Sequence, residues 1–224
     1  MSASSSTILR YTESDPDVRL MLRVRDDDPE AFGELVERYQ HRVTSLLAYQ
    51  VGRRDLAEDL AQEVFLRVFR ARDRYEPGAK FSTWLFAITN NVGLNALRTL
   101  ARRKEVRLAA GAPDETGAPT LQPADASSAM PTRQADRTEL REAVRAAIET
   151  LGERQRMAVM LAKFENLDYA QIGEVMGLSV GGVKSLLARA RESLRSALGP
   201  YLERGEAVAG LLGPDPAGEG EGGA

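Results

Sequence analysis

The spacing of the apolar residues is the feature that most limits what this chain can fold into. Wherever these residues are dense, they recur every three or four positions. This is the period of an amphipathic helix, and no stretch alternates apolar and polar residues as a strand would. The periodic stretches form two segments, residues 21–107 and 136–203, separated by a small, polar, proline-bearing stretch at 108–135. Because that stretch buries too little to offset its ordering entropy, the sequence predicts an all-α fold of two small helical domains joined by a flexible linker.

Both ends of the chain are predicted to be disordered tails. Residues 1–20 and 204–224 lack clear helical periodicity, and the second stretch is glycine-rich and mildly acidic. The first stretch does not have the basic-then-apolar order of a secretion signal. No apolar run approaches the ~20 residues that a membrane span needs. We therefore expect a cytoplasmic protein that does not insert into a membrane.

The residue inventory excludes several kinds of site. The chain has no cysteine and one histidine, His41, so disulfides, thiolate metal sites and histidine-based sites are not expected. His41 is interpreted as an ordinary surface residue. No nucleophile, base and oxyanion donor form a catalytic set, so we expect neither an enzyme nor a bound cofactor or metal. With a net charge of −3, any DNA contact must use local basic stripes or a partner's help.

Capping residues predict where three helices of the first segment begin. Asp28, followed by Pro29, is the N-cap candidate of the first of these helices. Asp55 is expected to cap the second and Ser82 the third, which spans 81–103. The apolar face of the second helix is predicted to consist of Leu56, Leu60, Val64, Phe65, Val68 and Phe69.

The third helix carries an unusual polar stripe. At about 100° per residue, one narrow line collects Trp84, Asn91, Asn95, Arg98 and Arg102. Arginines neutralise phosphates, amides hydrogen-bond base edges, and an aromatic ring stacks on an unpaired base. The stripe therefore favours contact with single-stranded or flipped nucleotides. The alternative is that Trp84 belongs to the core and the asparagines are simply solvated.

The second helix has an acidic side that is unsuited to DNA. This side consists of Asp55, Glu58, Asp59, Gln62 and Glu63. No histidine accompanies these carboxylates, and their spacing is that of an ordinary amphipathic helix. A solvated face is the default interpretation, and a basic protein partner is the functional alternative.

Four helices are predicted in the second segment, at 137–150, 153–164, 169–176 and 180–198, and the last two form a helix-turn-helix at 168–188. Asp168 is expected to cap the third helix, and Gly177 lies where a left-handed residue ends it. Ser179 is expected to cap the last helix, while the small Gly173 suits a close crossing. A purely structural helical hairpin is the alternative to DNA binding.

The last helix divides into a buried and an exposed side. The predicted buried stripe consists of Val180, Val183, Leu187, Ala190, Leu194 and Leu198. The opposite side, near the helix start, consists of Gly181, Gly182, Lys184, Ser185, Ala188 and Arg189. Small residues and a few long donors at that end suit entry into the major groove of duplex DNA.

Three blocks together resemble a known family: DDPEAFGELVERYQHRV, EDLAQEVFLRVF and FSTWLFAITNN, followed by the helix-turn-helix. In this order they resemble bacterial RNA polymerase sigma factors of the sigma-70 family. The most similar group is the two-domain extracytoplasmic-function (ECF) type. The resemblance implies a sigma factor that binds core RNA polymerase and directs promoter-specific initiation.

The resemblance also implies a role for each surface. The acidic helix, through Asp55, Glu58, Asp59, Gln62, Glu63 and Phe65, would dock on the clamp helices of the largest polymerase subunit. A contact with the β flap is implied as well. The melted −10 element would be held by Lys80, Ser82, Trp84, Asn90, Asn91, Asn95 and Arg98. The duplex −35 element would be bound by Gly181, Gly182, Lys184, Ser185 and Arg189. An anti-sigma factor is a further partner found in this family.

One position departs from the family pattern. Leu186 stands where many relatives carry a basic residue after the position of Ser185. We therefore expect fewer phosphate contacts or an altered sequence preference at this point, with the fold unchanged.

Two other interpretations remain open from the residues. The chain could be a stand-alone helix-turn-helix regulator whose N-terminal segment senses or dimerises. It could also be a helical adaptor that uses its acidic faces for protein contacts only. Dependence on core polymerase separates the three, because only a sigma factor needs the core enzyme for promoter-specific transcription.

Overall fold

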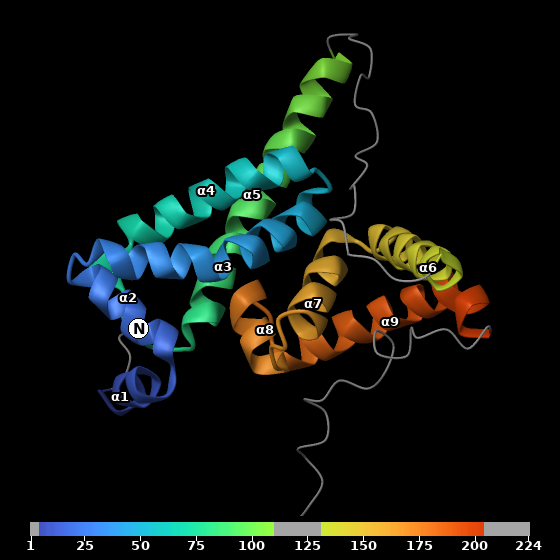
Figure 1. The fold of residues 1–224 in the computed structure, drawn as a ribbon. Helices are drawn as coiled ribbons and strands as arrows, with labels where there is room; N and C mark the ends of the chain where they lie inside the picture. The colour runs from blue at the N-terminus through green and yellow to red at the C-terminus, as the bar shows by residue number, and fades with distance from the viewer. Residues whose placement is uncertain (1–4, 110–130, 204–224) are drawn as a thin grey trace, which may run out of the picture. The chain divides into compact units, whose positions relative to one another are not determined.

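The computed structural model describes residues 5–109 and 131–203, and the regular structure of both ranges is helical (Figure 1). This confirms the predicted all-α fold. The chain divides into two compact units between Leu121 and Gln122. That boundary, most of the predicted linker at 108–135 and the predicted tail at 204–224 lie outside the described residues.

Helix α3 is the centre of the first domain. The domain consists of α1 (Ser5–Ser14), α2 (Pro16–Arg25), α3 (Pro29–Val51), α4 (Arg54–Arg70), a 3-10 turn (Arg72–Arg74) and α5 (Phe81–Ala109). Helices α2, α4 and α5 all pack on α3. From α3, Leu35, Val43 and Leu47 are almost fully buried, and so are Val64 of α4 and Leu85 of α5, the helices that pack on α3.

The N-terminal stretch differs from the disordered tail expected at 1–20. Residues 5–14 form α1, and α2 begins at Pro16. Val18, Met21 and Val24 of α2 have at most 1% of their surface exposed, which shows that this helix belongs to the core. These three residues have helical spacing, and the expectation failed because its boundary at residue 20 cut through this single helix.

Two of the three predicted caps of the first domain are corrected. Asp28 does cap α3, because its carboxylate accepts hydrogen bonds from the N–H groups of Glu30 and Ala31. Asp55, however, lies in the first turn of α4, whose N-cap is Arg53. Ser82 likewise lies inside α5, which begins one residue earlier at Phe81.

The second domain consists of α6 (Pro131–Glu149), α7 (Glu153–Lys163), α8 (Tyr169–Met176) and α9 (Val180–Glu203). Helix α9 packs on the other three. The predicted helix-turn-helix is present in α8 and α9. Asp168 accepts a hydrogen bond from the Gln171 N–H at 2.8 Å and caps α8 as predicted.

The turn between α8 and α9 follows from local residues. Gly177 has φ of 64°, the left-handed conformation that glycine adopts without strain. The Ser179 hydroxyl accepts a hydrogen bond from the Gly182 N–H, which caps α9. A Cβ on Gly173 would lie 2.6 Å from the backbone oxygen of Leu178. The predicted close crossing is therefore confirmed, since nothing larger than glycine fits against this oxygen.

None of the described helices has the length and apolar character that crossing a bilayer requires.

The close approach at Gly173 generates a stability prediction. Gly173→Ala is expected to lower the free energy of unfolding of the second domain by about 1–3 kcal/mol, because backbone must move to admit the methyl group. Circular dichroism in urea would detect this change, while the fluorescence of Trp84, the single tryptophan, reports only the first domain. Gly199→Ala is the control, since a Cβ there meets nothing within 4 Å. Equal stability of the two variants would contradict the prediction.

Candidate nucleic-acid interfaces

The polar stripe predicted on α5 is exposed. Asn91, Asn95, Arg98 and Arg102 are all exposed, whereas Leu85, Phe86 and Val92 on the other sides of the helix have at most 3% of their surface exposed. The Arg98 guanidinium donates a hydrogen bond to the Asn95 side-chain oxygen at 2.8 Å. This contact orders the two side chains along the helix. The ridge presents both amide groups and positive charge to solvent.

Trp84, at the start of this ridge, lies partly in an aromatic cluster. Its ring centroid is 4.9 Å from that of Tyr75, in an edge contact, and 5.9 Å from that of Phe81. The side chain is half-buried, so it is neither a core residue nor freely solvated. Packing on one side fixes the ring while part of it remains accessible. A fixed, accessible ring is suited to stacking, because little conformational entropy is lost on contact.

Two hydroxyl groups near Trp84 lack hydrogen-bond partners among the described residues. The Tyr75 hydroxyl and the Thr83 hydroxyl are both buried and unpaired. Burial, together with the nearby Asp15 and Asp17 carboxylates, raises the pKa of Tyr75, so its hydroxyl keeps its proton. Unpaired buried polar atoms are costly and are rare in folded proteins. Both atoms can accept a hydrogen bond and can donate one.

Five of the seven residues predicted for the −10 element share this region. Lys80, Asn91, Asn95 and Arg98 are exposed, and Trp84 is half-buried. Ser82, the sixth, is partly buried in the first turn of α5. Trp84, Asn91, Asn95 and Arg98 lie along one side of α5, Lys80 directly precedes the helix, and Ser82, two residues before Trp84, lies on a different side.

Asn90, the seventh, corrects the prediction. Only 4% of its surface is exposed, and its side-chain oxygen accepts a hydrogen bond from the Gln50 amide at 3.3 Å. Asn90 therefore joins α5 to α3 inside the domain and cannot reach DNA. The sequence could have separated it from Asn91, since one helical step of about 100° carries neighbouring residues onto different faces.

The predicted DNA-facing side of α9 is also exposed. Gly181, Lys184, Ser185 and Arg189 are exposed, and Gly182 is partly buried at the N-terminal end of the helix. The Lys184 ammonium lies 5.9 Å from the centroid of the Tyr169 ring, which belongs to α8. At this distance a cation–π attraction acts between the two helices. The N-terminal end of α9 is therefore small, basic and supported by α8.

Two apolar residues of α9 differ from the prediction. Val180, placed on the buried stripe, is 43% exposed, because it is the first residue of the helix and lies beyond the packed core. Leu186 is only 9% exposed. It packs in the domain interior, so the leucine at this position does not leave a gap in the exposed basic surface.

The acidic side of α4 is exposed but partly neutralised. Arg67 donates a hydrogen bond to Glu63 at 2.7 Å and thereby lowers the pKa of that carboxyl. The hydrogen bond from Arg53 lowers the pKa of Asp55 in the same way. Asp59, at the middle of the exposed side, makes no ion pair within the described part of the chain. Asp59 therefore has the charge most available to a partner.

The apolar side chains of α4 are arranged differently from the prediction. Phe65, predicted to contact polymerase, is 9% exposed and belongs to the core. Leu66 is 50% exposed and Phe69 is 40% exposed, although Phe69 was assigned to the buried face. The Phe69 ring packs against Phe32 at 5.1 Å. Leu66 lies two turns from Asp59 on the same line of the helix. This spacing could have identified Leu66 as part of the exposed side.

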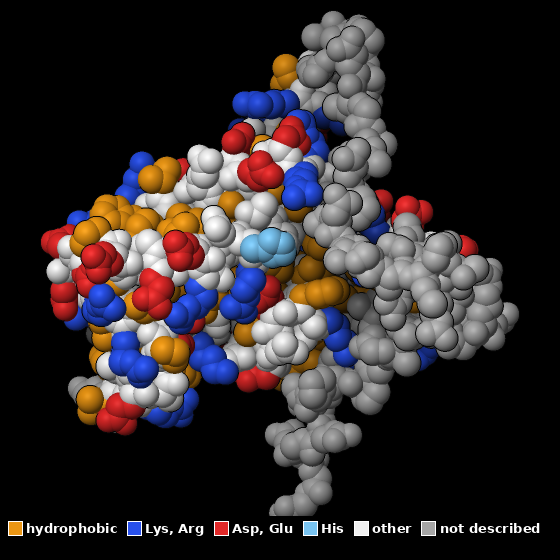
Figure 2. Space-filling model, in the orientation of Figure 1, with side chains coloured by type: hydrophobic (Ala, Val, Ile, Leu, Met, Phe, Trp, Pro, Cys, Tyr) orange, Lys and Arg blue, Asp and Glu red, His pale blue; other side chains and the backbone are white. Residues whose placement is uncertain are grey.

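The charged side chains on the face of the first domain shown in Figure 2 are of mixed sign. Acidic and basic side chains are interspersed there, and His41 is exposed on the same face. No cluster of three or more possible metal ligands occurs in the two described ranges.

The comparisons with known proteins match both domains. The family model "Sigma-70 region 2" covers residues 35–103, and "Sigma-70, region 4" covers residues 141–194. The ECF RNA polymerase sigma-E factor of Escherichia coli K12 is 34% identical over 188 residues, which are 83% of this chain and 95% of that protein. This chain belongs to the ECF group of sigma-70 factors. The RNA polymerase sigma-H factor of Pseudomonas aeruginosa is 35% identical over 192 residues, with the same coverage.

Solved structures agree with this assignment. CnrH, solved in complex with the cytosolic domain of CnrY, is 25% identical with a TM-score of 0.58, covering 83% of this chain and 99% of CnrH. The fold also matches the sigma factor RpoE of Bartonella quintana, in complex with the anti-sigma factor NepR, at a TM-score of 0.59 and 24% identity, over 75% of this chain and 96% of that one.

Membership of the family decides between the three interpretations. A sigma factor directs RNA polymerase to promoters and is a subunit of the initiation machinery, not an enzyme. The resemblance seen in the sequence is therefore confirmed. A stand-alone regulator and a simple helical adaptor are both excluded.

The two neighbouring asparagines of this sigma factor generate a prediction. Asn90→Ala is expected to lower the free energy of unfolding of the first domain by about 1–3 kcal/mol, because the buried Gln50 amide loses a partner. Asn91→Ala should stay within about 0.5 kcal/mol of the wild type, as expected for an exposed residue. Urea unfolding followed by Trp84 fluorescence measures both. If Asn91→Ala is the more destabilising change, the assignment of faces on α5 is wrong.

Proposed function

We propose that the two domains of this sigma factor divide promoter recognition between melted and duplex DNA. In this proposal, the α5 ridge binds the opened −10 element and the exposed end of α9 binds the duplex −35 element. The observation that carries it is the environment of Trp84, which is held by Tyr75 and Phe81 yet half-exposed at the end of a polar ridge. A ring in this position can stack only on a base whose face is free, and paired bases hide their faces.

The chemistry along α5 supports contact with one unpaired strand. Lys80, Arg98 and Arg102 supply positive charge for phosphates, and the Asn91 and Asn95 amides can pair with base edges. Ser82 completes the set at the first turn. Asn90 is left out of the proposed site because it is buried.

The chemistry of α9 supports contact with duplex DNA. Gly181 and Gly182 let the helix start approach the bases closely, and Lys184, Ser185 and Arg189 supply donors on the exposed side. The buried Leu186 implies that phosphate contacts near this position come from these neighbours. A helix with such an end fits the major groove, whose width admits one helix.

The proposal assigns Trp84 and Arg189 to separable steps. Trp84→Ala is expected to lower run-off transcription from a duplex promoter by about tenfold or more, since stacking on one base contributes about 1–3 kcal/mol. A promoter with a pre-melted bubble should restore most of this loss. Arg189→Ala should lower transcription by about tenfold only where an upstream element is needed, and a bubble should not restore it.

Each of these two variants is the control for the other, and both are measured with purified core enzyme. If the bubble fails to rescue Trp84→Ala, the ring acts as packing and the proposed role of α5 is wrong. If Arg189→Ala has the same effect on promoters without the upstream element, α9 does not read that element.

We also propose that the exposed side of α4 docks on core polymerase. Asp59, Gln62 and Glu63 form its acidic part, with Asp55 and Glu58 one or two turns earlier. Leu66 and Phe69 provide the apolar part in place of the buried Phe65. A mixed acidic and apolar surface suits the basic clamp helices that the family resemblance implies. Apolar contacts supply affinity, and charges supply orientation and association rate.

The unpaired charge of Asp59 provides the test of this surface. Asp59→Lys is expected to weaken binding to core polymerase by about tenfold at low salt, with a smaller effect at high salt because exposed charges are screened. Fluorescence anisotropy of the labelled chain titrated with core enzyme measures the affinity. Glu37→Lys, on the exposed side of α3, is the control of equal charge. If both variants lose the same affinity for core polymerase, the effect comes from net charge alone and the specific site on α4 is rejected.

An anti-sigma factor is proposed as a further partner. The solved structure of the related CnrH is a complex with the cytosolic domain of CnrY. The exposed Leu66 and Phe69 are a surface that such a protein could cover. A true partner would compete with core polymerase and reduce run-off transcription. A protein that binds without competing would contradict shared use of this surface.

A further inference from the structure

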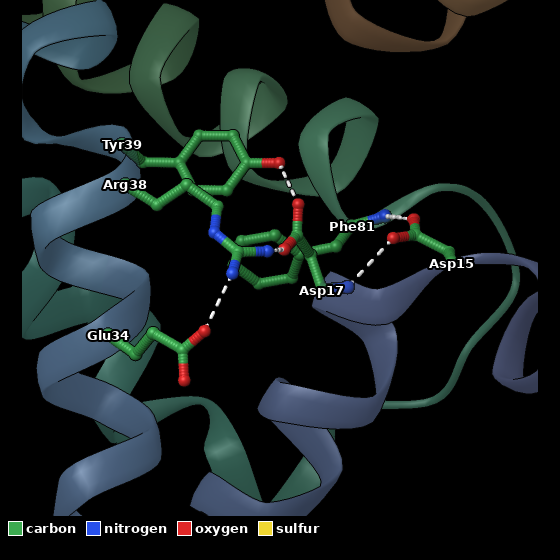
Figure 3. A network of polar contacts seen from close by, with 6 residues as sticks. All are labelled: Asp15, Asp17, Glu34, Arg38, Tyr39 and Phe81. Atoms are coloured by element: carbon green, nitrogen blue, oxygen red, sulfur yellow. Dashed lines mark hydrogen bonds and ion pairs between the residues drawn. The ribbon is translucent and has the colours of Figure 1, made fainter.

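The start of α5 is held by a residue that lies far from it in sequence. The Asp15 carboxylate accepts a hydrogen bond from the Phe81 N–H at 2.9 Å, across 66 positions of the chain. Its other oxygen accepts one from the Asp17 N–H, also at 2.9 Å, and caps α2. One side chain therefore satisfies the first N–H groups of two helices (Figure 3).

A second acidic residue, Asp17 of α2, joins the same region to α3. Asp17 accepts a hydrogen bond from the Tyr39 hydroxyl at 2.5 Å and is paired with Arg38 (Figure 3). The Tyr39 ring makes an edge contact with the Phe81 ring, with centroids 5.4 Å apart. Helices α2, α3 and α5 therefore meet around Phe81, through polar contacts on one side and aromatic contacts on the other.

The residues on either side of Phe81 belong to the proposed −10 site. Lys80 precedes it, Ser82 follows it, and Trp84 packs on its ring at 5.9 Å. No side chain from within α5 binds the Phe81 N–H in this structure, because the hydrogen bond goes to Asp15. The position of the site thus depends on a contact made by the N-terminal helices.

We propose that Asp15 is a positioning residue for promoter opening, which sets the start of α5 so that Lys80 and Trp84 meet the unpaired strand. This inference rests on the proposed role of α5 and deepens it. Asp15 itself touches no DNA in this account. It acts through Phe81, by holding the first turn of α5 in the one orientation that presents the Trp84 ring.

The competing explanation is that Asp15 only stabilises the fold, as any helix cap does. Asp28 offers a matched comparison in the same domain. It also caps a helix with its carboxylate, accepting hydrogen bonds from Glu30 and Ala31 and a third from the Arg23 guanidinium of α2, but it lies at the start of α3. Loss of either cap should reduce stability to a similar extent. Only the loss of Asp15 should change the accessibility of the Trp84 ring and the rate of promoter opening.

The experiment uses the full chain and two measurements. Acrylamide quenching of Trp84, the only tryptophan, reports how the ring is held in the free protein. Run-off transcription with core enzyme, on duplex and on pre-melted templates, reports opening. The variants are Asp15→Ala, Asp15→Asn, Asp28→Ala, Trp84→Ala and the double variant Asp15→Ala with Trp84→Ala.

Asp15→Ala is expected to increase acrylamide quenching of Trp84. It is also expected to lower transcription from the duplex template about fivefold, because loss of one capping bond lowers the population of molecules with α5 correctly placed by about that factor. The bubble template should restore it. Asp15→Asn should fall between Asp15→Ala and wild type, because its amide oxygen can still accept a hydrogen bond from an N–H group. Asp28→Ala should change neither measurement. The double variant should transcribe no worse than Trp84→Ala alone, since both changes remove the same step.

The inference is overturned if Asp15→Ala behaves as Asp28→Ala does, or if its effect multiplies with that of Trp84→Ala. Failure of the underlying role of α5 has a different signature, because Trp84→Ala alone would then lose nothing on the duplex or gain nothing from the bubble. If Asp15→Ala does not fold, the comparison of Asp15→Asn with Asp28→Ala decides the question by the same two measurements.

Discussion

A helix begins with backbone N–H groups that have no partner inside the helix, and this constraint organises both domains. In α3, α8 and α9 the partner is a side chain next to the helix: Asp28, Asp168 and Ser179. In α5 it is Asp15, the residue between α1 and α2, which also caps α2. The difference matters because the first turn of α5 carries the aromatic end of the proposed −10 site. A local cap fixes only where a helix starts, whereas a distant cap also fixes how it lies against its neighbours.

The same difference explains which parts of the protein could be predicted from sequence. The helix-turn-helix is specified by adjacent residues, and its caps at Asp168 and Ser179, its left-handed Gly177 and its small Gly173 were all found where they were expected. The family blocks extended this prediction to both domains and to the function. Prediction worked where the physical cause lies within a few residues of its effect.

Contacts between distant segments were the part that the sequence did not reveal. Helix α2 packs on α3, but the boundary expected at residue 20 cut through it, so residues 5–20 were mistaken for a tail. Helical phase separates Asn90 from Asn91, but the partner of Asn90, the Gln50 amide of α3, lies 40 residues away and was not foreseen. On α4, Phe65 and Phe69 were both placed on the apolar face, but only Phe65 is buried, because α3 and α5 cover one side of the helix and not the other. In each case a neighbour from elsewhere in the chain decides exposure.

The distribution of charged side chains also depends on local pairing. The chain is acidic overall, with a net charge of −3, yet both proposed DNA contacts include exposed basic side chains: Lys80, Arg98 and Arg102 in the first domain, and Lys184 and Arg189 in the second. Arg53, the N-cap of α4, pairs with Asp55, and Arg67 pairs with Glu63. Asp59 is left as an exposed, unpaired charge on this helix. Phosphate contacts dominate non-specific affinity for DNA, so an acidic protein binds DNA weakly on its own. Such a balance suits a promoter-recognition subunit, because its local basic surfaces gain their effect only when polymerase holds them on the promoter.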